Sequence, residues 1–149
     1  MKNQTIIAAL ITLLFSLSAS AGSGQPDSLQ ALSAWTNQSG STLYIDTIDS
    51  NGQLTGTYIN RASGYGCQNI SYPVTGWVYG TAITFTTIWQ SSTESCNSIT
   101  AWTGFYYQGQ ISTLWQLTIN GSSSTSQIVQ GSDTFSQSTA VVNKSLIIE

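Results

Sequence analysis

Short runs of alternating apolar and polar residues follow one another along most of this 149-residue chain. In the run at residues 81–89, Ile83, Phe85 and Trp89 share one parity, so on a β-strand their side chains would point to the same face. Turn residues divide the runs, and the clearest divider is Asn51-Gly52, a pair typical of tight β-hairpins. No stretch of the sequence keeps a helical period. The pattern predicts strands at residues 35–37, 41–48, 53–60, 71–79, 81–89, 98–108, 110–119 and 125–135.

Strands joined mostly by hairpin-length loops form an antiparallel meander, which must either close into a barrel or fold into a sandwich. Eight strands of about eight to ten residues suit a closed barrel whose interior holds one small ligand. Pro73 lies near the beginning of its run, which indicates a strand start or an edge, because proline has no N–H to donate to a ladder. The predicted fold class is all-β, an eight-stranded antiparallel up-and-down β-barrel.

The first 21 residues have the pattern of a secretory signal peptide. Lys2 precedes an apolar run at residues 6–17, and Ala19-Ser20-Ala21 supplies a small-residue cleavage site. A transmembrane anchor is the alternative, but the run is shorter than the ~20 residues needed to span a bilayer. We therefore expect cleavage after Ala21, a secreted or periplasmic mature protein, and no membrane attachment.

The remaining sequence divides into three parts by composition. Residues 22–34 form a polar N-terminal leader, residues 35–135 the barrel domain, and residues 136–149 a C-terminal tail. The tail is polar until it ends in Leu146-Ile147-Ile148, which is unusual for a chain end. We expect this apolar end to dock on a surface of the barrel.

Charged residues are scarce, and the charge balance excludes several classes of function. The formal net charge is −3, so the chain does not attract phosphate backbones and nucleic-acid binding is not expected. The sequence contains no histidine, which removes Ser-His-Asp and Cys-His catalytic sets and the typical zinc ligand sets. A glycosidase would need two cooperating carboxylates, and only Asp133 is expected inside the barrel. Neither an enzyme nor a metal site is expected.

Cys67 and Cys96 are the two cysteines of the chain. In an exported protein their default state is one disulfide. Such a bond would close a loop of about 29 residues and stabilise the fold by roughly 3.5 kcal/mol on the chain-entropy model. The alternative is a free thiol nucleophile, which would have no histidine to activate it.

The inward faces of a closed barrel would gather polar and aromatic side chains at one end. A core seldom uses such residues for packing alone, because an unpaired buried polar group costs roughly 1–3 kcal/mol. Apolar walls with a few converging polar groups are the usual form of a small-ligand pocket. Taken singly, the tryptophans could instead be barrel filler and the first polar residues could cap a hairpin. The inward set comprises Asn37, Ser41, Tyr58, Asn60, Thr100 and Asp133 with Trp89, Trp102 and Trp115, while Trp35, Leu43, Phe85 and Phe135 would plug the other end.

Four motifs follow one another in a familiar order along this predicted domain. They are Trp-x-Asn-Gln-x-Gly-Ser-Thr at residues 35–42, Leu-Thr-Gly-Thr-Tyr at 54–58, Thr-Ala-Trp-Thr-Gly at 100–104 and Gly-x-Asp-Thr-Phe at 131–135. In both content and order they resemble the avidin/streptavidin family. The paired cysteines make the chain most similar to the short dimeric avidins. The resemblance implies high-affinity binding of biotin, as a ligand and not as a cofactor.

The resemblance also implies a role for each pocket residue. The Asn37 amide and the Ser41 and Tyr58 hydroxyls would donate to the ureido oxygen of biotin. Asp133 and Asn60 would accept the two ureido N–H groups, with Asn60 standing where streptavidin has a serine. Charge-assisted bonds of this kind are about twice as strong as neutral ones. The other implied contacts are the walls Trp89, Trp102 and Trp115, the Thr100 hydroxyl facing the sulfur, and Ser98, Ala62 and Ser63 near the valerate carboxylate.

One departure from the family bears on the oligomeric state. Family tetramers complete each pocket with a tryptophan from a neighbouring subunit, and here no tryptophan follows Trp115, with Thr125 nearest to that position. In the dimeric relatives a disulfide between two ligand-side loops compensates by holding the mouth preorganised, and Cys67 and Cys96 lie in those loops. The resemblance therefore implies a homodimer. The alternative function is a barrel module that binds another small apolar ligand or a protein partner.

Overall fold

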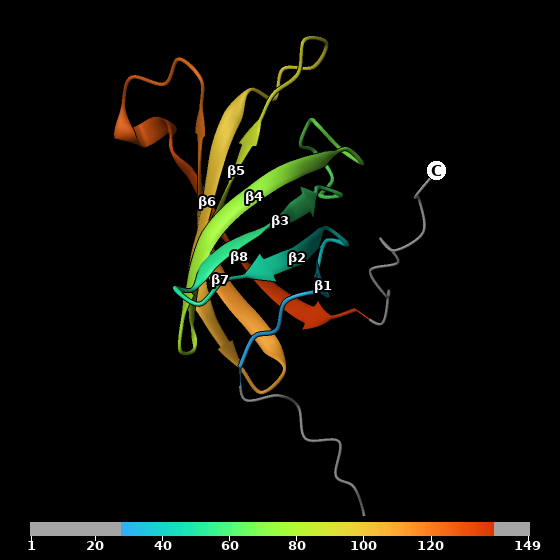
Figure 1. Cartoon of the computed structure of the whole chain (residues 1–149). Coiled ribbons are helices and arrows are strands. Elements are labelled where there is room, and N and C mark those ends of the chain that lie inside the picture. Colours follow the sequence, from blue (N-terminus) through green and yellow to red (C-terminus); the bar gives the residue numbers. More distant parts are fainter. Residues whose placement is uncertain (1–27, 139–149) are drawn as a thin grey trace, which may run out of the picture.

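The computed structural model describes residues 28–138, which form one closed antiparallel barrel (Figure 1). Neighbouring strands pair in the order of the sequence, and β8 pairs with β1 to close the ring. This confirms the predicted fold class. The expected signal peptide and the tail from residue 139 onward, with its apolar end, lie outside the described residues. The strands are β1 (Ser33–Asn37), β2 (Thr42–Ile48), β3 (Gln53–Ile59), β4 (Ser71–Tyr79), β5 (Ala82–Trp89), β6 (Ser98–Tyr107), β7 (Gln110–Ile119) and β8 (Val129–Gln137).

The last strand begins later than the alternating pattern predicts. Residues Thr125–Gln127 form a short 3-10 helix, η1, and β8 starts at Val129. The Gln127 side-chain oxygen accepts hydrogen bonds from the backbone N–H groups of Ser123, at 2.8 Å, and Ser124, at 2.9 Å. These bonds hold a tight turn where the sequence suggested an extended chain. Within residues 28–138, no helix is long and apolar enough to cross a membrane.

Gly76 of β4 shows how closely β4 and β5 approach each other. Gly76 faces inward, and a Cβ atom there would lie 2.0 Å from the carbonyl oxygen of Thr84 and 2.8 Å from the Cα of Phe85 in β5. Only glycine fits at this distance, so this position lets β4 curl against β5. Pro73, earlier on β4, pairs with Thr57 of β3 before the pairing with β5 begins, as expected for a proline at a strand start.

The two ends of the barrel differ in their filling. Because neighbouring strands are antiparallel, one end is formed by the starts of odd-numbered strands and the ends of even-numbered strands. The expected plug fills this closed end: Trp35, Leu43, Phe85 and Phe135 are each at most 2% exposed. The rings of Phe85 and Phe135 pack edge to face with centroids 6.2 Å apart. The opposite end, here called the mouth, carries the longer β3–β4, β5–β6 and β7–β8 connections (Figure 1).

Candidate ligand-binding site

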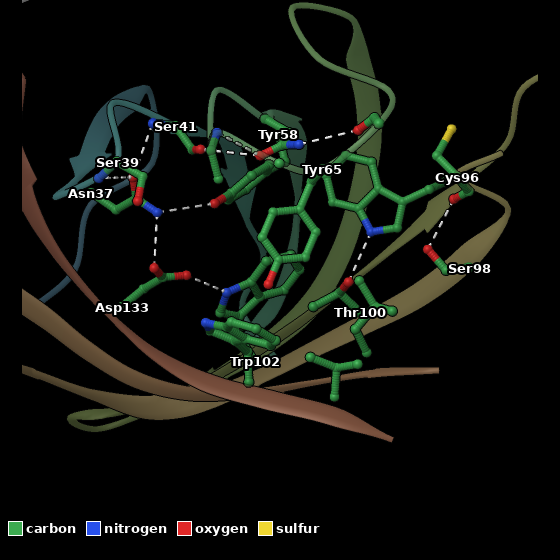
Figure 2. Close-up of a pocket in the computed structure, with 18 of the residues that line it drawn as sticks. Asn37, Ser39, Ser41, Tyr58, Tyr65, Cys96, Ser98, Thr100, Trp102 and Asp133 are labelled. Carbon is green, nitrogen blue, oxygen red and sulfur yellow. Dashed lines mark hydrogen bonds between the residues drawn. The ribbon is translucent and has the colours of Figure 1, made fainter. Parts of the chain in front are cut away.

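The mouth leads into a cavity of about 310 Å³ inside the barrel. This volume lies in the range of small-molecule sites. Side chains at the ends of odd-numbered strands and the starts of even-numbered strands line it, together with residues of the connecting loops (Figure 2). Apolar groups form most of the wall, and the polar groups converge on the side formed by β1, β2, β3 and β8.

Asn37, at the end of β1, connects the first hairpin turn to the cavity (Figure 2). Its side-chain oxygen accepts the backbone N–H groups of Ser39, at 3.0 Å, and Ser41, at 2.9 Å. This asparagine-capped turn explains why the chain reverses within so few residues. The side-chain nitrogen of Asn37 donates in the opposite direction, to Asp133 at 2.9 Å and to the Tyr58 hydroxyl at 3.3 Å. The residue therefore both caps the hairpin and presents its amide to the cavity.

Asp133 of β8 is the buried anion of the site, 8% exposed. Its Oδ1 accepts hydrogen bonds from Asn37 Nδ2 and Gln38 Nε2, each at 2.9 Å. Its Oδ2 accepts one from the indole N–H of Trp102, also at 2.9 Å (Figure 2). Hydrogen bonds to an ionised group are strong, and together they satisfy a charge that burial would otherwise disfavour. The carboxylate is thus held in one orientation at the cavity wall.

Tyr58 of β3 presents its hydroxyl beside Asn37. Burial raises the pKa of this phenol well above its ordinary value, the negative charge of Asp133 raises it further, and a hydrogen bond with Ser41 lowers it. The group therefore stays protonated and can donate a hydrogen bond throughout the physiological pH range. Its ring stacks on Trp102 with centroids 4.9 Å apart, which fixes the direction of the hydroxyl.

Ser41 and Asn60 connect the polar side of the cavity to the β3–β4 loop. The Ser41 hydroxyl accepts the backbone N–H of Arg61 at 2.8 Å and donates to the Asn60 side-chain oxygen at 3.4 Å. That same oxygen accepts the N–H of Ala62 at 3.0 Å, and the Asn60 nitrogen donates to the carbonyl of Gly66 at 3.2 Å. Asn60 therefore anchors the loop at two points besides facing the cavity, a function that its position in the sequence did not suggest.

Tryptophans form the apolar walls. The Trp89 indole N–H donates to the Thr100 hydroxyl at 2.8 Å, so these two predicted site residues are in direct contact. Trp115 is only partly buried and lies against β8, where a Cβ at Gly131 would come within 2.4 Å of its ring. Glycine at position 131 therefore leaves the space that this indole occupies. Ser98 lines the outer part of the cavity and donates to the carbonyl of Cys96 at 3.0 Å.

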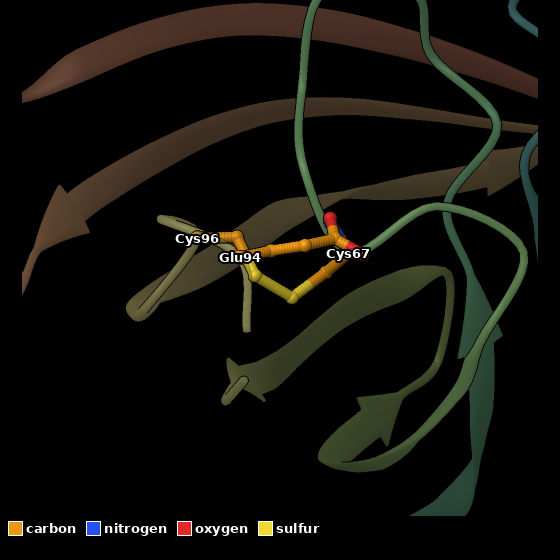
Figure 3. A group of neighbouring side chains, drawn as sticks. All are labelled: Cys67, Glu94 and Cys96. Carbon is orange, nitrogen blue, oxygen red and sulfur yellow. A yellow bond between two sulfur atoms is a disulfide. The ribbon is translucent and has the colours of Figure 1, made fainter. Parts of the chain in front are cut away.

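The predicted disulfide between Cys67 and Cys96 is confirmed, and it joins the β3–β4 and β5–β6 loops at the mouth (Figure 3). The two Cα atoms are 5.9 Å apart. Glu94 lies beside the bond, where its carboxylate accepts the backbone N–H of Cys67 at 2.6 Å. These three side chains have a spacing that could suit a metal ion, but both sulfur atoms are bonded to each other. The cluster serves instead to fix the two loops.

The structure brings most of the predicted site residues to one cavity. Those that line it are Asn37, Ser41, Tyr58, Asn60, Ala62, Trp89, Ser98, Thr100, Trp102, Trp115 and Asp133. Ser63 is exposed and does not line the cavity, because the loop turns inward one step later and presents Gly64, Tyr65 and Gly66. Arg61, next to Asn60, turns away from the cavity and donates to the carbonyl of Gly40 and the hydroxyl of Thr42.

Several lining residues were not predicted. Leu117 and Ile119 share the parity of Trp115 on β7, so the alternating pattern could have identified them. Tyr65 lies in a loop, where no periodicity predicts which side chain turns inward. Gln38 reads as an ordinary turn residue in the sequence, yet it both lines the cavity and contacts Asp133.

Comparison with known proteins identifies the class. The model of the avidin family matches residues 25–138, so the chain belongs to that family, as its motifs suggested. Afifavidin from Afifella pfennigii is 42% identical over 118 residues, which cover 76% of this chain and 70% of afifavidin. The fold matches a shwanavidin variant solved in complex with biotin (TM-score 0.71, 63% identity, 76% of this chain and 100% of that chain). It also matches the rhizavidin–biotin complex (TM-score 0.65, 48% identity, 79% of this chain and 100% of that chain).

Proposed function

We propose that this protein binds biotin, without catalysing a reaction, in the cavity at the mouth of the barrel. The observation that carries the proposal is the buried Asp133 carboxylate, held by Asn37 and Trp102 beside the protonated Tyr58 hydroxyl. A cyclic urea has one strong acceptor oxygen flanked by two N–H donors, and this group of side chains offers the complementary donors and acceptors. The biotin complexes of two structural neighbours support the same ligand.

Biotin would replace two long hydrogen bonds within the site. The bonds between Asn37 and Tyr58, at 3.3 Å, and between Ser41 and Asn60, at 3.4 Å, are the weakest of the polar group. A ureido oxygen placed among Asn37, Ser41 and Tyr58 would draw all three donors to itself. When Ser41 turns to the ligand, the Asn60 oxygen regains a free lone pair for one ureido N–H, and Asp133 accepts the other. Binding therefore replaces weak hydrogen bonds within the protein by stronger ones between the protein and the ligand.

The remainder of biotin is apolar apart from its terminal carboxylate. Trp89, Trp102 and Trp115 would enclose the bicyclic ring and the aliphatic chain, with the Thr100 hydroxyl facing the sulfur. Ser98 and Ala62 line the outer part of the cavity, near the expected carboxylate position. Because the disulfide holds both flanking loops in place, little loop ordering remains to oppose binding.

Titration of the purified protein with biotin, followed by tryptophan fluorescence, tests the proposal. We expect a saturable change at stoichiometric biotin. Lipoic acid is the matched control, since it has a sulfur ring and a five-carbon acid chain but no urea, and it should bind far more weakly. Equal binding of the two ligands would favour a general apolar site. No binding at micromolar biotin would overturn the assignment.

The outer face of β4 to β7 supports a homodimer, the assembly that the resemblance to the short dimeric avidins implies. None of the residues in these four strands is charged. Large apolar side chains are nevertheless exposed there, among them Ile88, Ile99, Phe105 and Leu114. Depletion of charge together with exposed aromatic and aliphatic groups is typical of the centre of a protein interface. A second copy of this chain is the occupant we propose for this face.

The solution mass measured by light scattering tests this assembly, and we expect twice the mass of one chain. Leu114→Lys places a charge in the middle of the face and should give a monomer. Thr47→Lys, on β2 at the opposite side of the barrel, is the control that should leave the mass unchanged. A monomeric or tetrameric wild-type protein would contradict the proposal.

We also propose that the protein is exported, to the periplasm or the medium. The disulfide supports this localisation, because such bonds persist mainly in oxidising compartments. In a bacterial host that expresses the full chain, the intact mass of the exported protein should correspond to a chain beginning at Gly22. A full-length mass in the cytoplasmic fraction would contradict it.

A further inference from the structure

The seam between β1 and β8 ends shortly before it reaches Asp133. Within residues 28–138, the β1–β8 ladder contains the pairs Trp35↔Gln137, Thr36↔Ser136 and Asn37↔Phe135. On its other edge β8 continues to pair with β7 as far as Val129. Before Phe135 in the chain, β1 no longer lies beside β8, because β1 has turned into the first hairpin. Within the described chain, the β1-facing edge of β8 around Asp133 therefore has no strand beside it. Unpaired strand groups at this point need other partners.

The side chain of Gln38 supplies those partners. Its nitrogen donates to the carbonyl of Ser132 at 3.1 Å, and its oxygen accepts the backbone N–H of Thr134 at 3.0 Å. A carboxamide carries the same donor and acceptor as a peptide group, so these two bonds continue the ladder by one rung after the backbone of β1 has left. The rung spans Asp133, the residue between its two contacts.

The second N–H of Gln38 reaches the carboxylate itself. It donates to Asp133 Oδ1 at 2.9 Å, the same oxygen that Asn37 contacts. With this bond both donors and the acceptor of the Gln38 amide are used. Because one planar group makes all three contacts, the orientation of the Asp133 carboxylate is tied to the closure of the barrel seam.

We infer that Gln38 is a positioning residue for ligand binding, acting through Asp133. It holds the Asp133 carboxylate in one orientation for a ureido N–H, although Gln38 itself is not one of the residues proposed to bond to biotin. This inference rests on the proposed biotin site. It also applies to the ligand-free protein, since Gln38 couples the β1–β8 seam to the Asp133 carboxylate before any ligand enters.

The test compares Gln38→Met, which keeps the length of the side chain without its hydrogen bonds, with Gln110→Met at the start of β7, near the closed end. Biotin should leave Gln38→Met about tenfold faster than the wild-type protein, and Gln110→Met should match the wild type. In an Asp133→Ala background, the ratio of biotin off-rates with and without Gln38→Met should fall to about one. An equal factor in both backgrounds would show that Gln38 acts only through general stability and would overturn the inference.

The variant Gln38→Glu provides a second test, because it should introduce a pH dependence of biotin binding that a purely structural role would not produce. The introduced carboxyl keeps an acceptor for Thr134 but faces Asp133, so binding relative to the wild type should be weak at neutral pH. It should recover at about pH 4 to 5, where the new group protonates and can donate again. A pH-independent ratio between variant and wild type would contradict the inference.

A measurement without ligand separates this inference from the biotin assignment. The Trp102 indole N–H donates to Asp133 Oδ2, so its NMR resonance reports the orientation of the carboxylate in the free protein. We expect this resonance to shift in Gln38→Met and to stay unchanged in Gln110→Met. If the wild type fails to bind biotin, the proposed function falls, and the indole shift still decides whether Gln38 positions Asp133. An unchanged indole resonance would overturn the positioning role.

Discussion

The closed end and the mouth of the barrel are built from the same strands and the same alternation, yet their inward side chains serve different purposes. At the closed end Leu54, Phe85 and Phe135 exclude solvent completely. At the mouth, Asn37, Tyr58 and Asp133 occupy equivalent inward positions and form a hydrogen-bonded group around a cavity. The comparison shows that folding stability and ligand binding are assigned to different halves of one interior.

The closed end offers the largest expected effect on stability. Leu54→Ala removes a fully buried side chain and should lower the free energy of unfolding by about 2–5 kcal/mol. The molecules that remain folded should bind biotin with nearly unchanged affinity, because Leu54 does not line the cavity. Denaturant unfolding and biotin off-rates, measured on the same sample, check the separation. A large change in off-rate would show that the two halves are coupled.

The mouth should show the reverse behaviour. Asp133→Ala removes the acceptor of three side-chain donors and of one ureido N–H, so biotin affinity should fall by about 2–4 kcal/mol. The free energy of unfolding should change less, since water entering the open cavity can satisfy the released donors. Calorimetric titration measures the affinity, and denaturant unfolding provides the control. If the free energy of unfolding fell more than the free energy of biotin binding, Asp133 would serve mainly folding stability, as the residues of the closed end do.

Tyr58→Phe removes one ureido donor and should weaken biotin binding by about 1–3 kcal/mol. It should also change the alkaline pH dependence of stability. Because the folded pKa of Tyr58 is raised, the unfolded chain loses this proton first, and stability falls as pH rises above about 10. The variant lacks this contribution, so its stability should decline less steeply above pH 10. Identical slopes in the two proteins would contradict the buried, protonated state of the phenol.

The smallest effect is expected between the two halves, at Thr87. Its hydroxyl is buried and has no hydrogen-bond partner in the described part of the chain. Thr87→Val replaces it with a methyl group of similar size and should stabilise the protein by about 1 kcal/mol without altering biotin affinity. Thr86→Val, on the partly exposed outer face of the same strand, controls for the higher strand propensity of valine. Thermal unfolding of the two variants decides whether burial of the hydroxyl is the cause.

Sequence alone was sufficient for most of the interior, because a strand side chain has only two faces to choose from. Once one inward residue of β5 is known, Phe85, Thr87 and Trp89 follow by parity, and the same reasoning separates the plug from the pocket. The motifs then identify the family, and the family assigns a ligand to the pocket.

Sequence was insufficient where the chain leaves the strands. In the β3–β4 loop, the disulfide and the two bonds of Asn60 decide that Tyr65 and not Ser63 reaches the cavity. Those constraints act across the fold and leave no local pattern. Gln38 was missed for a related reason, since its partners Ser132 and Thr134 are distant in the chain. The turn after Ser124 was missed because a side chain there replaces strand pairing.

The direction of the first and last strands has a practical consequence. β1 starts and β8 ends at the closed end, where Trp35 pairs with Gln137 and the N–H of Ser138 bonds to the carbonyl of Ala34. The chain therefore enters β1 and leaves β8 at the closed end, which is the base of the barrel, on the side away from the mouth. A tether or fusion partner joined next to residue 28 or residue 138 would hold the protein by this base, with the ligand entrance facing freely into solution.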